Sequence, residues 1–106
     1  GYRARSAFKL IQIQEETGII QPGMVVLDLG CAPGSWLQVL SKTVGPDGRV
    51  LGIDLQTVDK FPQKNIATFV GDMTSSDSHA EMKNFLREVQ MEGKEIEKSK
   101  EEAGIW

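Results

Sequence analysis

The sequence predicts a parallel α/β fold, in which strands and helices alternate around one small sheet. Three short apolar runs, at residues 24–29, 49–54 and 66–70, have the length and the residue types of strands. Between the first two runs, apolar residues recur at the spacing of one helix face: Trp36, Leu37, Val39, Leu40 and Val44. Strand, helix, strand and strand in this order fit a right-handed parallel unit with sheet order 3-2-1.

Length and composition allow one modest domain. The chain has 106 residues, of which 40% are hydrophobic and 25% charged. It has no apolar run near the roughly 20 residues of a membrane span and no signal pattern at its start, so we expect no membrane partner and a cytoplasmic location, with the mitochondrial matrix as the alternative. Cys31 is the only cysteine and His79 the only histidine. We therefore expect no metal, and we expect Cys31 to be a small buried filler.

Charge is distributed unevenly along the chain. The formal net charge of −3 does not indicate a nucleic-acid-binding protein. The first residues are nevertheless basic, because Arg3, Arg5 and Lys9 are opposed only by Glu15 and Glu16. A surface for nucleic acid would have to lie there.

The elements before the second strand have clear boundary signals. We expect a helix over residues 7–17, capped by Ser6 and stopped by Gly18. The strand at 24–29 is apolar on both faces until Asp28, which is typical of a strand in the interior of a parallel sheet. The sequence Gly45-Pro46-Asp47-Gly48 ends the second helix with strong turn residues.

The last 29 residues differ from the rest of the chain in their pattern of apolar and charged residues. From residue 78 a helical pattern places Met82, Phe85, Leu86 and Val89 at core spacing. The charged stretch at 92–102 follows and carries almost no apolar side chains, so we expect a solvated helix or a frayed tail.

A glycine turn joins the first strand to the second helix. Gly30 and Gly34 are four residues apart and do not form the pattern G-x-G-x-x-G, which disfavours a pyrophosphate and favours a cofactor without phosphates. Glycine is needed where the backbone approaches a ligand closely, and Pro33 stiffens the loop. The alternative is a simple tight turn.

Acidic residues near the ends of the strands suggest further ligand contacts. Asp54 follows the turn by about 20 residues, the spacing at which a carboxylate binds a ribose diol, although it could also only cap its strand. Asp72 could accept from an adenine amino group or form a turn with Thr74. We expect Asp28 to accept from the amides of the glycine turn. For Trp36 we favour a place in the core over a contact with the cofactor.

At these residues the sequence resembles the FtsJ/RrmJ-type ribosomal RNA 2′-O-ribose methyltransferases, which use S-adenosyl-L-methionine. The first matching block is residues 2–10, YRARSAFKL, which is similar to the basic N-terminal helix of that family. The second is residues 28–36, DLGCAPGSW, where the family more often has alanine in place of Cys31. Gly52-Ile53-Asp54-Leu55 and Gly71-Asp72 resemble its ribose and adenine acids.

The resemblance implies a Rossmann-like methyltransferase fold and a set of roles. Lys9 would take the first position of the family's catalytic Lys-Asp-Lys-Glu set and would orient or deprotonate the ribose hydroxyl. Arg3 and Arg5 would contact RNA phosphates. The cofactor-binding residues would be Gly30, Ala32, Pro33, Gly34, Trp36, Asp54 and Asp72. The partner would be ribosomal RNA of the large subunit, free or within the ribosomal subunit.

The resemblance ends near residue 72. No later segment is similar to the strands that carry the family's remaining Asp, Lys and Glu. We therefore expect residues 1–76 to form the cofactor-binding half of a methyltransferase domain, with the N-terminal helix where RNA enters, and residues 77–106 to form a helical, charge-rich segment. The fold would be only the first half of the family's sheet.

Three readings of the function follow. The first is an RNA 2′-O-ribose methyltransferase, as a truncated chain. The second is a non-catalytic module that binds S-adenosylmethionine and RNA. A third is half of a nicotinamide-dependent oxidoreductase.

Overall fold

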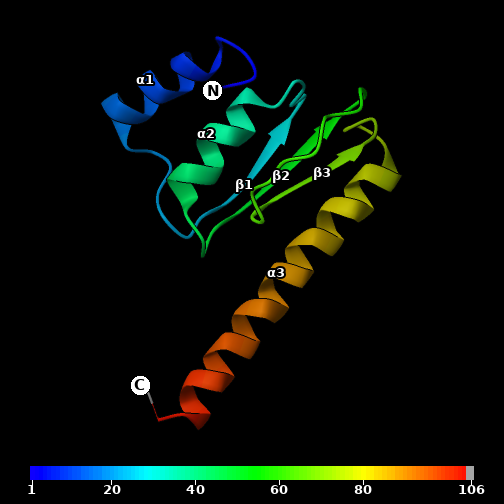
Figure 1. Ribbon diagram of the computed structural model, residues 1–106. Coiled ribbons are helices and arrows are strands. Elements are labelled where there is room, and N and C mark those ends of the chain that lie inside the picture. The colour runs from blue at the N-terminus through cyan, green and yellow to red at the C-terminus, as the bar shows by residue number, and fades with distance from the viewer. Residues whose placement is uncertain (105–106) are drawn as a thin grey trace.

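A computed structural model describes residues 1–104 and has three parallel strands with helices on both faces of the sheet (Figure 1). Its elements are α1 (Ala7–Thr17), β1 (Val25–Leu29), α2 (Ser35–Val44), β2 (Arg49–Asp54), β3 (Ile66–Val70) and α3 (Ser76–Glu102). The sheet order is β1-β2-β3, and Leu27 pairs with Leu51, which pairs with Ala67. The predicted fold class and the order 3-2-1 are confirmed.

The core lies between the sheet and α2, with α1 packed on the outer side of α2. Leu37, Val44 and Val50 are fully buried there. Cys31 is 5% exposed in the same cluster, so its predicted role as a small filler is confirmed. The core therefore holds the start of α2, and with it the glycine turn, against β2.

Ser6 occupies the N-cap position of α1 but does not cap the helix. Its backbone is helical (φ −57°, ψ −20°), whereas a capping serine needs an extended backbone to turn its oxygen toward the helix amides. The Ser6 hydroxyl instead bonds the Ser35 hydroxyl at 2.8 Å. The prediction of a capping side chain is wrong, whereas the predicted stop at Gly18, with φ +59°, is correct.

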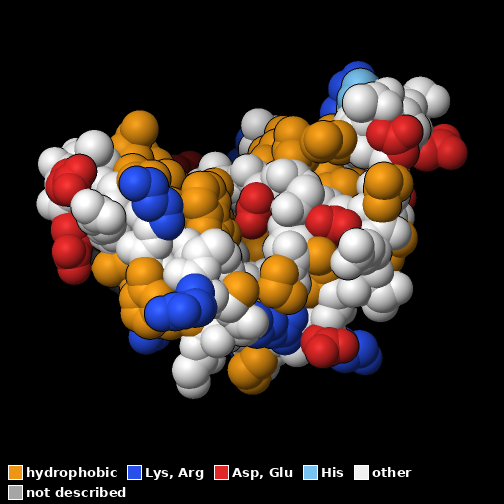
Figure 2. Space-filling model, turned by 90° about the horizontal axis from the view of Figure 1, so that it is seen from above, with side chains coloured by type: hydrophobic (Ala, Val, Ile, Leu, Met, Phe, Trp, Pro, Cys, Tyr) orange, Lys and Arg blue, Asp and Glu red, His pale blue; other side chains and the backbone are white. Residues whose placement is uncertain are grey.

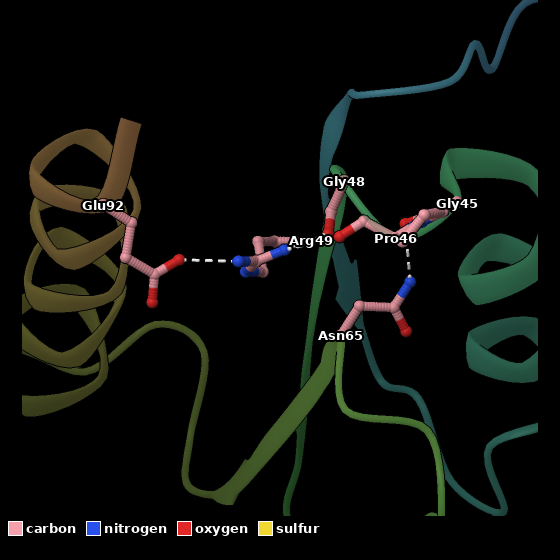
Figure 3. Close-up of polar contacts among 6 residues, drawn as sticks. All are labelled: Gly45, Pro46, Gly48, Arg49, Asn65 and Glu92. Atoms are coloured by element: carbon pink, nitrogen blue, oxygen red, sulfur yellow. Dashed lines mark hydrogen bonds and ion pairs between the residues drawn. The ribbon is translucent and has the colours of Figure 1, made fainter. Parts of the chain in front are cut away.

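Helix α3 runs along the face of the sheet opposite α2 and continues beyond it (Figure 1). Its apolar residues Met82, Phe85 and Val89 are half-buried, and all its residues after Val89 are exposed. An ion pair between Arg49 and Glu92, at 2.6 Å, ties it to the start of β2 (Figure 3). Of the two forms predicted for the charged stretch, a solvated helix or a frayed tail, the structure shows the solvated helix. Residues 105 and 106 lie outside the described part. No helix within residues 1–104 is both long and apolar enough to cross a membrane.

Strand β1 forms an edge of the sheet, as the predicted order 3-2-1 requires, although its apolar composition is typical of an interior strand. Among the strands within residues 1–104 its only partner is β2, and Val25, Leu27 and Leu29 are 38%, 38% and 49% exposed. An apolar strand with free backbone groups on one side is what native sheets avoid. Its composition therefore suits a strand that has neighbours on both sides.

Candidate functional site

Two cavities lie where the parallel strands end, and Gly30 lines both. The larger, about 320 Å³, is lined by Ser6, Asp28, Leu29, Gly30, Cys31, Ala32, Pro33, Ser35 and Trp36. The smaller, about 180 Å³, is lined by Gly30, Ile53, Asp54, Leu55, Gly71, Asp72 and Met73. Figure 2 looks onto this end of the molecule and shows acidic side chains among apolar ones at its centre. The carboxyl ends of parallel strands are where α/β proteins bind ligands.

The glycine turn is fixed to the end of β2 by its backbone amides. The amides of Gly30 and Cys31 both donate to the Ile53 carbonyl, at 2.7 and 3.2 Å. The next amide, of Ala32, donates to Asp54 Oδ2 at 2.9 Å. The shape of the turn is therefore set before any ligand arrives.

The two glycines of the turn are needed for different reasons. Both have positive φ angles, +77° at Gly30 and +111° at Gly34. A Cβ at Gly30 would meet nothing within 4 Å, so its surface is open. A Cβ at Gly34 would overlap the Phe61 ring and lie 3.2 Å from an Arg3 nitrogen. The expected room for a ligand exists at Gly30, whereas Gly34 makes room for the protein's own side chains.

Asp54 is an ionised acceptor at the end of β2. Its Oδ1 accepts from the Gln56 amide at 2.8 Å and its Oδ2 from the Ala32 amide. These bonds, that of Gln56 first, lower the pKa of the Asp54 carboxyl. Each carboxylate oxygen has a further lone pair, so Asp54 can still accept from a ligand in the smaller cavity.

Asp72 forms the predicted turn with Thr74. Its Oδ1 accepts from the Thr74 hydroxyl at 2.6 Å and from the Thr74 amide at 2.8 Å. The hydroxyl, and then the amide, lower the pKa of Asp72. The turn is one of the two alternatives that the sequence left open; the adenine contact stays a prediction, and Asp72 does line the smaller cavity beside Asp54.

Asp28 does not hold the turn, and that prediction is wrong. The turn's amides are already taken by the Ile53 carbonyl and by Asp54. Asp28 Oδ2 is buried without a hydrogen-bond partner, and Asp28 lines the larger cavity. Burial, and then the negative charge of Asp54, raise the pKa of Asp28. An unpartnered carboxylate oxygen suits a ligand with a positive charge or a donor group, a role that our sequence analysis missed.

Trp36 lies at the cavity and not in the core that we expected. It is 36% exposed, its indole N–H donates to the Ser6 carbonyl at 2.9 Å, and it lines the larger cavity. It lies in the first turn of α2, while Leu37 and Leu40 of the same helix belong to the buried core. The ring therefore belongs to the candidate site. Leu55 and Met73, which directly follow the two strand-end acids, also line it and were missed.

The basic residues of the N-terminal segment lie in different surroundings. Lys9 is exposed on the first turn of α1, three residues after Ser6, which lines the larger cavity. Arg5 is exposed. The Arg3 guanidinium donates to three backbone carbonyls, those of Pro33, Asp59 and Lys60. Within residues 1–104, no three potential metal ligands lie together.

The glycine turn and the acids at the strand ends define a parallel α/β protein with a ligand site at the carboxyl ends of its strands, preceded by a basic N-terminal segment. Comparison with known proteins identifies the family. The model of the family described as FtsJ-like methyltransferase matches residues 2–99. The chain belongs to this family.

The individual relatives are considerably longer than this chain. It is 52% identical to ribosomal RNA large subunit methyltransferase E of Methanocaldococcus jannaschii, covering 69% of this chain and 30% of that protein. The protein of the same name from Methanoculleus marisnigri is 54% identical, with coverages of 70% and 34%. The chain thus spans about a third of the curated relatives that it matches.

Solved structures agree with the fold. A ribosomal RNA methyltransferase from Plasmodium falciparum superposes with a TM-score of 0.61 at 32% identity, covering 72% of this chain and 41% of that one. A SAM-dependent methyltransferase from Aquifex aeolicus gives 0.53 at 27% identity, with coverages of 68% and 44%.

Proposed function

We propose that this chain is the cofactor-binding half of a methyltransferase that uses S-adenosyl-L-methionine to methylate a ribose 2′-hydroxyl of large-subunit ribosomal RNA. The observation that carries the proposal is the open backbone surface at Gly30. It lies where the two cavities meet, with the unpartnered oxygen of Asp28 in one and the ionised Asp54 in the other. The names of the relatives support the same activity.

The residues around Gly30 fit that cofactor. Asp54 has lone pairs that could accept from the two ribose hydroxyls, and Asp72, which lines the same cavity, would accept from the adenine amino group. The unpartnered oxygen of Asp28 would accept from the ammonium of the methionine part. Ala32, Pro33 and Trp36, which line the larger cavity, complete the cofactor-binding set, and Gly34 takes part in it through the shape of the turn. When bound, the cofactor supplies an electrophilic methyl group on a sulfonium.

The RNA side of the site belongs to the N-terminal segment. We assign Lys9 the role of orienting the ribose hydroxyl, or of taking its proton, as the oxygen attacks the methyl in line. It is one helical turn from Ser6 at the larger cavity, which supports this role. Arg5, and Arg3 through the N–H groups that its carbonyl partners leave free, would contact RNA phosphates.

The substrate and its place are part of the proposal. The archaeal relatives are named for the ribosomal RNA of the large subunit, which supports that RNA, free or in the subunit, as the partner. Because the proposed substrate is ribosomal RNA, we place the protein in the cytoplasm, with the mitochondrial matrix as the alternative.

A second candidate is a non-catalytic module that binds the cofactor and RNA. The observation that favours it is the position of Lys9, which is exposed on α1 and lines neither of the two cavities. The family model matches as far as residue 99, beyond the expected end of the resemblance near residue 72, but the described residues 73–104 contain helix α3 and no strand.

Calorimetric titration separates the readings. We expect the folded chain to bind S-adenosylmethionine and its demethylated product but not NAD, and Asp54→Ala to weaken that binding. Binding of NAD alone would favour the oxidoreductase reading.

Transfer of a tritiated methyl group to ribosomal RNA, abolished by Lys9→Ala and kept by the exposed control Lys83→Ala, would favour the enzyme over the module. A folded chain that binds neither ligand refutes the proposal.

A further inference from the structure

Arg3 connects three parts of the chain that are distant in sequence. One of its terminal nitrogens donates to the Pro33 carbonyl at 3.0 Å and to the Asp59 carbonyl at 2.8 Å. The other donates to the Lys60 carbonyl at 2.8 Å. The glycine turn and the loop between β2 and β3 are thus joined through one guanidinium.

The guanidinium also stacks on a ring that touches the turn. Its central carbon lies 3.7 Å from the centre of the Phe61 ring. Phe61 occupies the space that a Cβ at Gly34 would need, with the Arg3 nitrogen beside it. Arg3 and Phe61 therefore fill the space beside Gly34, whereas the space beside Gly30 is open.

The rest of the N-terminal segment is held to the same place. The Arg3 amide donates to Gln38 Oε1 at 2.7 Å, and the Ser6 hydroxyl and carbonyl bond Ser35 and Trp36. These contacts leave Arg3 little freedom to swing toward solvent. The bonded N–H groups of Arg3 therefore support the turn, and only its remaining N–H groups are available for a phosphate.

We propose that Arg3 is a positioning residue of the cofactor site, which holds residues 32–34 in their binding shape by bonding them to residues 59–61. The inference rests on the proposed function, because it concerns binding of the same cofactor. Its chemistry requires arginine. A planar guanidinium can bond three carbonyls and stack on a ring at once, whereas a lysine ammonium is a compact point charge that cannot.

The test compares Arg3→Lys and Arg3→Ala with Lys83→Ala, an exposed lysine of α3 that serves as the charge control. The full chain is titrated with S-adenosylmethionine at a temperature at which circular dichroism shows each variant folded. We expect both Arg3 variants to bind about tenfold or more weakly, since even one lost charged hydrogen bond corresponds to a change of that order. The control should bind as the wild type does.

Amide hydrogen exchange distinguishes positioning from general stability. We expect Arg3→Lys to lose protection at Gly30, Cys31 and Ala32, whose amides hold the turn, while Leu51 in β2 keeps its protection. Protection lost equally across the sheet would mean a merely structural role and overturn the inference. So would rescue of cofactor binding by lysine, since a role based on charge alone survives that exchange. If the wild-type chain itself binds no cofactor, the proposed function fails first.

Discussion

The two glycines of the turn allow a paired test, because alanine at each should fail in a different way. Gly30→Ala places a methyl group in open space at φ +77°, so the fold bears only the cost of a left-handed alanine. That cost is about 1–2 kcal/mol and is partly offset, by about 0.4–1 kcal/mol, because alanine restricts the unfolded chain. The expected net loss of unfolding free energy is about 1 kcal/mol.

Gly34→Ala bears the same backbone cost and a steric one. Its methyl group would overlap the Phe61 ring and crowd Arg3, and overpacking of this kind costs about 1–3 kcal/mol. The expected total is therefore about 2–4 kcal/mol, a large fraction of the stability of a small domain. Urea denaturation followed by circular dichroism gives both free energies, and the melting temperature should fall by about 4–8 °C for each kcal/mol.

Of the two variants, the one that is less destabilised, Gly30→Ala, should show the direct effect on ligand binding. Gly30→Ala, although well folded, should bind S-adenosylmethionine much more weakly, because its methyl group would take up open space at a residue that lines both cavities. Wild-type affinity in folded Gly30→Ala would refute the placement of the ligand. Equal destabilisation by both alanines would refute the packing argument at Gly34.

Three further predictions concern charge and the edge of the sheet. The pKa of Asp54 is lowered in the folded chain, so its contribution to the unfolding free energy is complete above an ordinary aspartate pKa of about 3.9 and is lost as the pH falls through its lower native pKa. The pKa of Asp28 is raised, so the ionised Asp28 destabilises the folded chain above about pH 4. Thermal melts across this pH range should therefore show that Asp28→Asn stabilises the chain and that Asp54→Asn does not. Leu27→Lys should reduce self-association in sedimentation experiments, because it charges the exposed β1 edge; a wild-type chain that stays monomeric at high concentration would contradict this. Glu92→Gln removes the ion pair with Arg49 and should lower the unfolding free energy by at most about 1 kcal/mol, because the Arg49 and Glu92 side chains are 28% and 52% exposed. Amide exchange should become faster in the second half of α3 alone.

Local sequence signals placed the elements well. The predicted strands at 49–54 and 66–70 match β2 and β3, and Gly18 ends α1 as expected, because turn residues and β-branched runs act over a few neighbours. The order of the sheet followed from the handedness of parallel connections. That order also places β1 at an edge, whereas its apolar composition suits an interior strand, because composition reports which neighbours a strand suits and not which are present.

The sequence by itself determined that a glycine turn between a strand and a helix is followed by acids at the ends of two further strands. Those are properties of spacing, and spacing fixes which groups reach one edge of a parallel sheet. Only the tertiary structure decided how the polar groups are paired. Asp54 and the Ile53 carbonyl, not Asp28, take the amides of the turn, Trp36 lies at the cavity, and Arg3 bonds carbonyls more than fifty residues away. Hydrogen bonds depend on angles and on distances of about 3 Å between atoms remote in sequence, and the pattern of residue types along a chain does not contain them.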